Sequence, residues 1–261
     1  MNWFGYLASI LIGVSLGLIG GGGSILTIPV LVYLFHINPV QATGYSLFIV
    51  GITSFSGAVK NYFRNTVNVK AGLYFSIVAS ATVLLIRNFV LHAIPENLFT
   101  IGNYTVTKSI SIMLVFSVLM LFSSVKMIFH DAPANNNSNG AFSLSKLILT
   151  ATGIGCVTGF LGAGGGFLII PSLIFIFHLP VKQAIGTSLL IISINSLIGF
   201  TGDLVHIQFD WFILLSISAC AVAGMFIGFM FNTKTDEVRL KKYFGWFVLA
   251  MAVYIILKEL L

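Results

Sequence analysis

Two glycine clusters, at residues 20–23 and 162–166, interrupt apolar runs at places where an anion could bind. Glycines in succession weaken a helix, so the short run that follows starts with backbone N–H groups that have no acceptor in a preceding turn. Those N–H groups, together with the partial positive charge of a helix start, attract an anion. The predicted binding groups at the two clusters are Gly22, Gly23, Ser24, Gly164, Gly165 and Gly166.

Uncharged polar side chains follow both clusters, in the matching segments QATGYS and QAIGTS. Their hydroxyl and amide groups can donate hydrogen bonds to sulfonate or carboxylate oxygens. The same groups could instead link helices or cap the next one, and both roles stay open. Asn195 lies deeper in its apolar run, where an amide is costly without a partner, and is a weaker candidate for lining a site. The other predicted binding residues are Gln41, Ser46, Gln183, Thr187 and Ser188.

Close packing between helices is the alternative explanation for the glycines, because small residues four apart let two helix backbones approach. We expect packing to account for Gly13 and Gly155, whereas the contiguous glycines exceed what packing requires. The residues with this spacing are Gly13, Gly17 and Gly21 in the first half and Gly155, Gly159 and Ala163 in the second.

The composition places these segments in a lipid bilayer. The 261 residues are 57% hydrophobic and 8% charged, with a mean hydropathy of +1.03, far from the usual globular balance. Apolar runs of about 20 residues without strict alternation indicate membrane helices rather than a barrel. The net charge of +6 is typical of a topology signal rather than of nucleic-acid binding. We predict no metal, cofactor or catalytic residue, since the two cysteines lie in separate apolar runs.

The apolar runs form two sets of five in the same order, and the second run of each set is too short to span a bilayer comfortably. A polar, Asn-rich linker at 130–143 separates a first repeat, 1–129, from a second, 144–261. The sequence thus predicts an all-α integral membrane protein of about ten hydrophobic helical segments, two of them half-membrane segments. The runs are 2–19, 24–36, 41–59, 70–94 and 107–129, then 144–162, 167–178, 183–200, 210–231 and 242–261.

An offset of 142 residues aligns 17–57 with 159–199 without a gap, and glycine, proline, histidine and glutamine coincide. The loop at 60–70 is basic, whereas its counterpart at 202–210 has aspartates and no Lys or Arg. Equivalent loops on opposite sides predict inverted-topology repeats, each crossing the membrane an odd number of times. Placing loop 60–70 in the cytoplasm puts ten of the thirteen Lys and Arg residues inside. Both termini are then outside, and a re-entrant hairpin in each half would keep the same parity.

Charged residues inside the apolar runs are few. We expect Arg87 to reach the outer interface by snorkelling, and we place Asp203 at a segment end, so that no buried carboxylate is evident. Dinucleotide, phosphate-loop and HExxH motifs are absent from the sequence. The "TGD" at Asp203 lacks the second intramembrane aspartate that an aspartyl protease needs. An enzyme is therefore disfavoured.

The paired motifs resemble those of the sulfite exporter TauE/SafE family. The second copy reads GFLGAGGGFLIIPSLIFIF followed by KQAIGTSLLI, and the first reads GLIGGGGSILTIPVLVYLF followed by QATGYSLFI. The resemblance implies a bacterial plasma-membrane transporter associated with export of sulfite, organosulfonates and related small anions. The first copy departs from the pattern at Tyr45, where the second has Thr187. If that hydroxyl contacts substrate, the two half-sites differ.

These observations predict a secondary transporter that exports a small anion, of the sulfite or organosulfonate type, across the bacterial inner membrane by alternating access. An anion channel, a carrier of small carboxylates or other oxyanions, and, less favoured, a membrane-embedded enzyme are the alternatives. The expected partners are the anion and the lipid bilayer, without nucleic acid. A homo-oligomer, the coupling ion and the direction of transport stay open.

Overall fold

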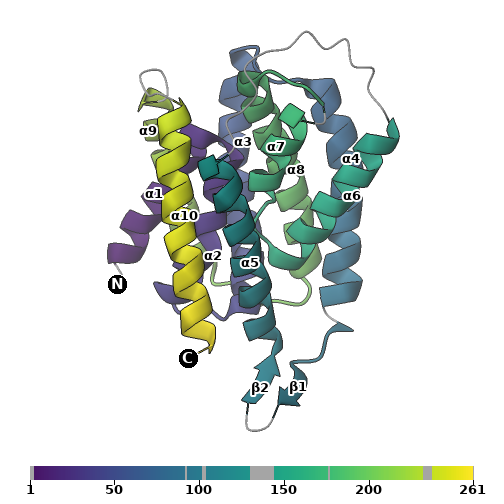
Figure 1. Cartoon of the computed structure of the whole chain (residues 1–261), viewed down its shortest axis with the longest axis vertical. Coiled ribbons are helices and arrows are strands. Elements are labelled where there is room, and N and C mark those ends of the chain that lie inside the picture. The colour runs from purple at the N-terminus through teal and green to yellow at the C-terminus, as the bar shows by residue number, and fades with distance from the viewer. Residues whose placement is uncertain are drawn as a thin grey trace.

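The two sets of apolar runs form two sets of helices in the same order. The computed structural model describes residues 3–91, 93–101, 104–129, 144–175, 177–231 and 237–260, and within them it contains ten α-helices and one β-hairpin (Figure 1). Six of the helices are long and apolar enough to cross a membrane. The ten predicted segments, two of them short, are confirmed. The predicted linker at 130–143 lies outside the described residues.

The first set starts with α1 and contains the glycine-rich 3-10 helix η1, a π-helical turn η2 and the hairpin. The sequence analysis predicted none of these last three elements. The hairpin interrupts the connection that follows η2, at one end of the molecule (Figure 1). The elements are α1 (Trp3–Ile19), η1 (Gly21–Leu26), α2 (Thr27–Tyr33), α3 (Pro39–Phe63), α4 (Val69–Leu85), η2 (Ile86–Leu91), β1 (Asn97–Ile101), β2 (Tyr104–Thr107) and α5 (Lys108–Phe129).

The second set repeats the order of the first without a described hairpin. Capping residues fix the same starts in both sets: Asn68 accepts a hydrogen bond from Ala71 N at the start of α4, and Asp210 caps its counterpart α9 through Phe212 N. The elements are α6 (Leu144–Leu161), α7 (Gly166–Phe175), α8 (Val181–Asp203), α9 (Trp211–Phe231) and α10 (Glu237–Leu260).

Both short helices end in the same backbone geometry. His36 and His178 have φ angles of 56° and 54°, in the left-handed region that often ends a helix. The next N–H in each copy returns to a carbonyl six residues earlier, from Ile37 to Leu31 and from Leu179 to Leu173. The repeat seen in the sequence is therefore also a repeat of local structure.

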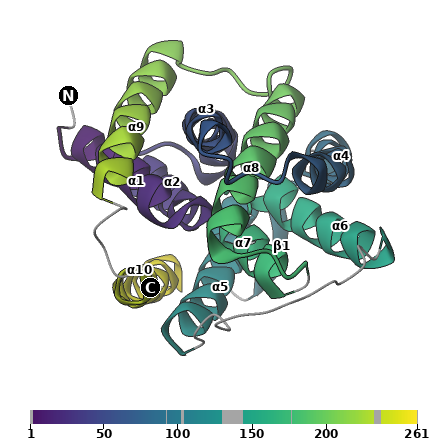
Figure 2. The same cartoon turned by 90° about the horizontal axis from the view of Figure 1, so that it is seen from above.

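Helices α3 and α8 lie side by side at the centre, with the α1–α9 pair on one side and the α4–α6 pair on the other (Figure 2). Helices α5 and α10 pack against each other outside this group. The central pair is antiparallel, because Gly51 faces Leu197 while Gly57, further along α3, approaches Leu189, which is earlier in α8. The first helix of each set packs on the fourth helix of the other set, α1 on α9 and α6 on α4.

Glycines make these reciprocal contacts close. A Cβ added at Gly13 would lie 1.8 Å from the Ala221 carbonyl oxygen of α9, and one at Gly155 would lie 2.7 Å from the Ala79 carbonyl oxygen of α4. Real Cβ atoms do not approach other atoms to less than 3.0 Å. The predicted packing role of Gly13 and Gly155 is therefore confirmed.

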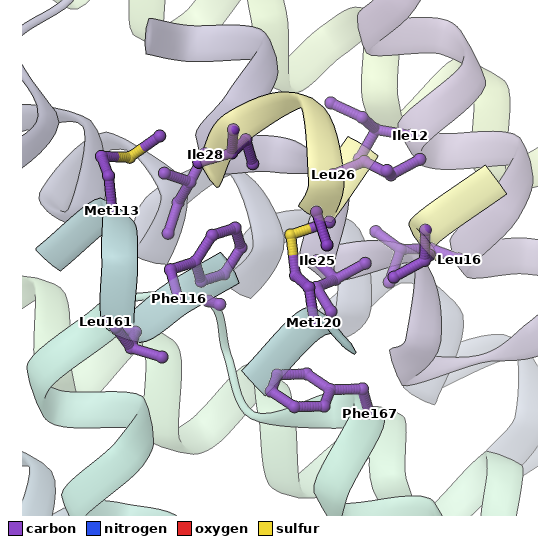
Figure 3. Packing of buried hydrophobic residues seen from close by; sticks show 14 of the residues in the cluster. Ile12, Leu16, Ile25, Leu26, Ile28, Met113, Phe116, Met120, Leu161 and Phe167 are labelled. Carbon is purple, nitrogen blue, oxygen red and sulfur yellow. The ribbon is translucent and has the colours of Figure 1, made fainter. Parts of the chain in front are cut away.

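The main apolar core surrounds the glycine-rich segments. Side chains of α5 face η1 and α2, and side chains that flank the second glycine cluster lie beside them (Figure 3). This packing keeps the glycine-rich backbone in an apolar environment, where electrostatic interactions are stronger than in water. The labelled residues are Ile12, Leu16, Ile25, Leu26, Ile28, Met113, Phe116, Met120, Leu161 and Phe167.

Candidate functional site

The two glycine clusters touch each other through their main chains. A Cβ at Gly166 would lie 2.2 Å from the Gly21 carbonyl oxygen, and a Cβ at Gly21 would lie 2.6 Å from the Gly166 Cα. Both positions are buried. Only residues without a side chain allow this approach, so the two helix breaks meet at one point, although they lie far apart in the sequence.

The second cluster starts a regular helix, as predicted. Gly164 and Gly165 have φ angles of 68° and 66°, a conformation that glycine adopts without a steric penalty. The first hydrogen bonds of α7 run from Leu168 N and Ile169 N to the Gly165 carbonyl. The N–H groups that precede them have no acceptor within the helix. They lie at the positive end of a ten-residue helix.

The first cluster has a different structure from the predicted helix start at Ser24. Residues Gly21–Leu26 form a 3-10 helix, and the α-helix begins only at Thr27. The Ser24 hydroxyl donates to the Gly21 carbonyl at 2.8 Å, which favours the tighter turn. The seven-residue α2 therefore presents a weaker N-terminus than α7 does, and the two halves of the site are unequal.

A polar side chain of α8, Ser196, lies at the second cluster, and a second buried polar residue precedes it. The Ser196 hydroxyl oxygen is 3.2 Å from the Cβ position of Gly164, and Asn195 precedes it in the chain. Both side chains are completely buried, and their polar atoms have no hydrogen-bond partner among the described residues. Such groups are costly unless something binds them. Asn195 is a predicted binding residue, and it stays a prediction.

Sequence reasoning missed Ser196 and its copy Ser54, although a signal was present. The two serines are identical residues at the 142-residue offset. Ser54 is also fully buried, and its hydroxyl has no hydrogen-bond partner among the described residues. A search for polar residues repeated inside the apolar runs would have found the pair.

Of the other predicted polar residues, the two glutamines are at least partly exposed, whereas the two serines are buried. Gln41 is exposed and Gln183 is half-buried in the first turns of α3 and α8, so neither belongs to the buried set. Ser188 donates to the Ile185 carbonyl at 2.8 Å. Ser46, its copy, is fully buried, and its hydroxyl has no hydrogen-bond partner among the described residues.

Thr187 and Tyr45 make equivalent bonds between the two halves. The Thr187 hydroxyl accepts a hydrogen bond from Asn68 N at 2.9 Å, and the Tyr45 hydroxyl accepts one from Asp210 N at 2.6 Å. Both donors and both acceptors are related by the 142-residue offset. The change from Thr to Tyr therefore leaves this interaction intact, and the acceptor capacity of each hydroxyl is partly used by the fold.

Arg87 and Asp203 form an ion pair in the protein interior, where the sequence analysis expected an interfacial arginine and no buried carboxylate. Both side chains are 0% exposed, and the pair joins η2 to the last residue of α8. Counting residues along a helix gives the reach of an arginine, but not the direction in which it points. The counter-ion comes from the other half of the chain, and it allows both charges to stay buried.

The ion pair borders the second glycine cluster. The Cβ position of Gly162 is 2.5 Å from Arg87 Nη2 and 2.3 Å from the Thr43 carbonyl oxygen. That of Gly44 is 2.8 Å from Asp203 Oδ2. The arrangement therefore combines a helix start, buried donors and a buried cation near the meeting point of two helix breaks.

The comparison with known proteins identifies the family. The family model described as "Sulfite exporter TauE/SafE" matches residues 6–255. The chain belongs to the TauE/SafE family. A probable membrane transporter protein of Xylella fastidiosa (strain 9a5c) is 29% identical over 252 residues, which cover 94% of this chain and 91% of the relative. No solved structure matches the chain significantly.

Two further relatives carry similar names. The probable membrane transporter protein YunE of Bacillus subtilis is 29% identical over 229 residues and covers 83% of both chains. The probable membrane transporter protein MJ0441 of Methanocaldococcus jannaschii is 37% identical over 117 residues, 42% of this chain and 44% of its own. Together with the six long apolar helices, these TauE/SafE relatives support a multi-pass membrane transporter rather than an enzyme.

Proposed function

We propose that this TauE/SafE protein is a secondary transporter that exports a small oxyanion, of the sulfite or organosulfonate type, across the bacterial inner membrane by alternating access. The contact between Gly21 and Gly166 carries the proposal. It brings two interrupted helices together at one point, which is how many secondary transporters form a substrate site.

The second cluster supplies donors that suit an oxyanion. The free N–H groups at the start of α7 and the hydroxyl of Ser196 can each donate to a sulfite or sulfonate oxygen. The Asn195 amide adds a further donor from the neighbouring residue. No carboxylate is needed for this donor set, so it favours anions over cations.

Two observations support inverted repeats with both termini outside. Helices α3 and α8 are antiparallel, as equivalent helices of inverted halves are when they pack together. Lys60, Arg64 and Lys70 lie at the connection between α3 and α4, and Lys182 at the start of α8 lies at the same end, because Gly186 contacts Thr66 there. The hairpin lies at the opposite end (Figure 1). A basic end is a cytoplasmic end by the positive-inside rule.

Counterflow in proteoliposomes tests the proposal. Vesicles loaded with unlabelled sulfite should accumulate labelled sulfite through the wild-type protein. Gly165→Leu should abolish this uptake, because a Cβ there would lie 2.2 Å from the Thr158 hydroxyl oxygen at a φ of +66°. Gly23→Leu should do the same, because its Cβ position is 2.5 Å from Leu16 N.

Gly153→Leu is the matched control. A Cβ at Gly153 meets nothing within 4 Å, so this variant should transport normally. All variants should insert into the membrane at wild-type levels. Normal uptake by both cluster variants would remove the helix-break mechanism, and unitary currents without counterflow would show a channel instead of a carrier.

A further inference from the structure

We infer that the Arg87–Asp203 pair is an anion-operated gate, in which the transported oxyanion competes with the Asp203 carboxylate for the Arg87 guanidinium. This inference rests on the proposed function and assigns a further substrate-contacting residue. Arg87 points to the second glycine cluster, since its Nη2 atom lies 2.5 Å from the Cβ position of Gly162. An anion at that cluster would therefore be close to a buried cation.

The pair occurs at one end of the molecule only, among the described residues. The 142-residue offset relates Asp203 to Asn61 and Arg87 to Phe229. At Phe229 the nearby cations are Lys60, whose Nζ lies 4.5 Å from the ring centroid, and Arg64, whose Cζ lies 6.0 Å from it. The end with the hairpin thus has a buried ion pair where the basic end has an amide and a ring, and the two ends cannot open by the same interaction.

Aromatic rings pack around the pair at the hairpin end. The Phe209 ring is 3.1 Å from the Cβ position of Gly44, which also borders Asp203. The Phe209 centroid is 5.1 Å from that of Tyr45 and 4.9 Å from that of Phe200. At the basic end the offset places non-aromatic residues at these three positions. They are Val67, Thr187 and Ala58.

The chemistry of arginine permits this exchange of anions. A guanidinium donates two parallel hydrogen bonds to a carboxylate, and equally to a sulfite or sulfonate. Removing the partner of a buried charge is strongly unfavourable, so Arg87 can leave Asp203 only for another anion. Asp203 is the last residue of α8, and the next residues, Leu204 and Val205, are 44% and 85% exposed, so the carboxylate can move away from Arg87 toward this exposed end.

The binding test uses purified protein and thermal shift with sodium sulfite, against sodium chloride at equal ionic strength. Sulfite should stabilise the wild-type protein. Asp203→Asn leaves the buried Arg87 charge without its carboxylate, so this variant should melt below the wild type. It should nevertheless lower the half-saturating sulfite concentration about tenfold or more, because the internal competitor is gone. The neutral double variant Arg87→Gln/Asp203→Asn leaves no unpaired charge, so it should fold but show no sulfite-specific shift and no flux.

The outcomes separate the gate from a structural ion pair. If the double variant keeps the wild-type sulfite shift and flux, the gate is wrong while the proposed function stands. If the wild-type protein shows neither shift nor flux with sulfite, thiosulfate and taurine, the proposed function and the gate both fall.

A second measurement leaves the ion pair intact. Thr43 is 0% exposed, and its carbonyl borders Gly162 beside Arg87. In a background without the native cysteines, a membrane-impermeant maleimide should label Thr43→Cys from outside faster when sulfite is present. Ser117→Cys on α5, also 0% exposed, should be unaffected by sulfite. An unchanged labelling rate at position 43 in an actively transporting variant would overturn the gate.

Discussion

The contact between the two glycine clusters predicts a specific sensitivity at Gly166. Gly166→Ala adds one methyl group, in a helix where alanine is intrinsically favoured over glycine by about 1 kcal/mol. Propensity alone therefore predicts stabilisation. The structure predicts the opposite, because the new Cβ would lie 2.2 Å from the Gly21 carbonyl oxygen and 2.4 Å from the Gly21 Cα.

The size of the effect follows from these distances. Restoring a separation of 3.0 Å requires the two main chains to move apart by 0.8 Å. Neither neighbour is a flexible side chain that could turn away. Overpacking of this kind costs about 1–3 kcal/mol, so we expect a net loss of stability in spite of the helix propensity. After the propensity gain of about 1 kcal/mol is subtracted, the net loss is up to about 2 kcal/mol. For a chain of this size that corresponds to a melting temperature lower by up to about 8 °C.

The assay is thermal unfolding of purified protein in one detergent, with counterflow measured below the melting temperature. Gly153→Ala is the control, since its Cβ position is open and only the propensity gain remains. It should melt at or slightly above the wild-type temperature. If Gly166→Ala also melts at or above the wild-type temperature, the two clusters do not touch as described, and the proposed site is wrong.

Two other predictions concern the relation between the halves. Thr187→Val should destabilise the protein by about 1–3 kcal/mol, because it leaves Asn68 N without its acceptor, whereas Thr187→Ser should unfold like the wild type in the same thermal assay. Single cysteines replacing Thr66 and His206, in a background without the native cysteines, should react with an impermeant maleimide from opposite sides of the membrane. Labelling from the same side would contradict inverted repeats.

The fold was predictable because its main signals are periodic or repeated. Apolar run lengths gave the ten helices, and the glycine pattern located α7 within a residue of its start at Gly166. The repeat also explains why Gly13 and Gly155 could be assigned to packing. At these glycines the lack of a side chain permits two main chains to approach more closely than any other residue allows. The residue type alone therefore predicts the contact.

Other features depend on contacts that no single segment encodes. The run at 70–94 looks uniform, yet it ends in the π-helical turn at Ile86–Leu91. Whether Arg87 faces lipid or protein is decided by its counter-ion Asp203, which lies 116 residues away. The 3-10 helix at the first cluster depends on the Ser24 hydroxyl, which donates within the turn. Local patterns predict elements, but not such pairings.

The repeat allows structural and functional differences between the halves to be separated. Tyr45 and Thr187 are different residues, yet each hydroxyl accepts a hydrogen bond from the equivalent N–H of the other half. Their difference therefore leaves this hydrogen bond unchanged. Arg87 and Phe229 differ in residue and in contact, because one has a carboxylate and the other a lysine over its ring. We expect a difference that also changes the contact to give the two ends different opening energies. In the proposed gate, a bound anion can replace the Asp203 carboxylate but not the Phe229 ring, so we expect the end with the hairpin to respond directly to the anion.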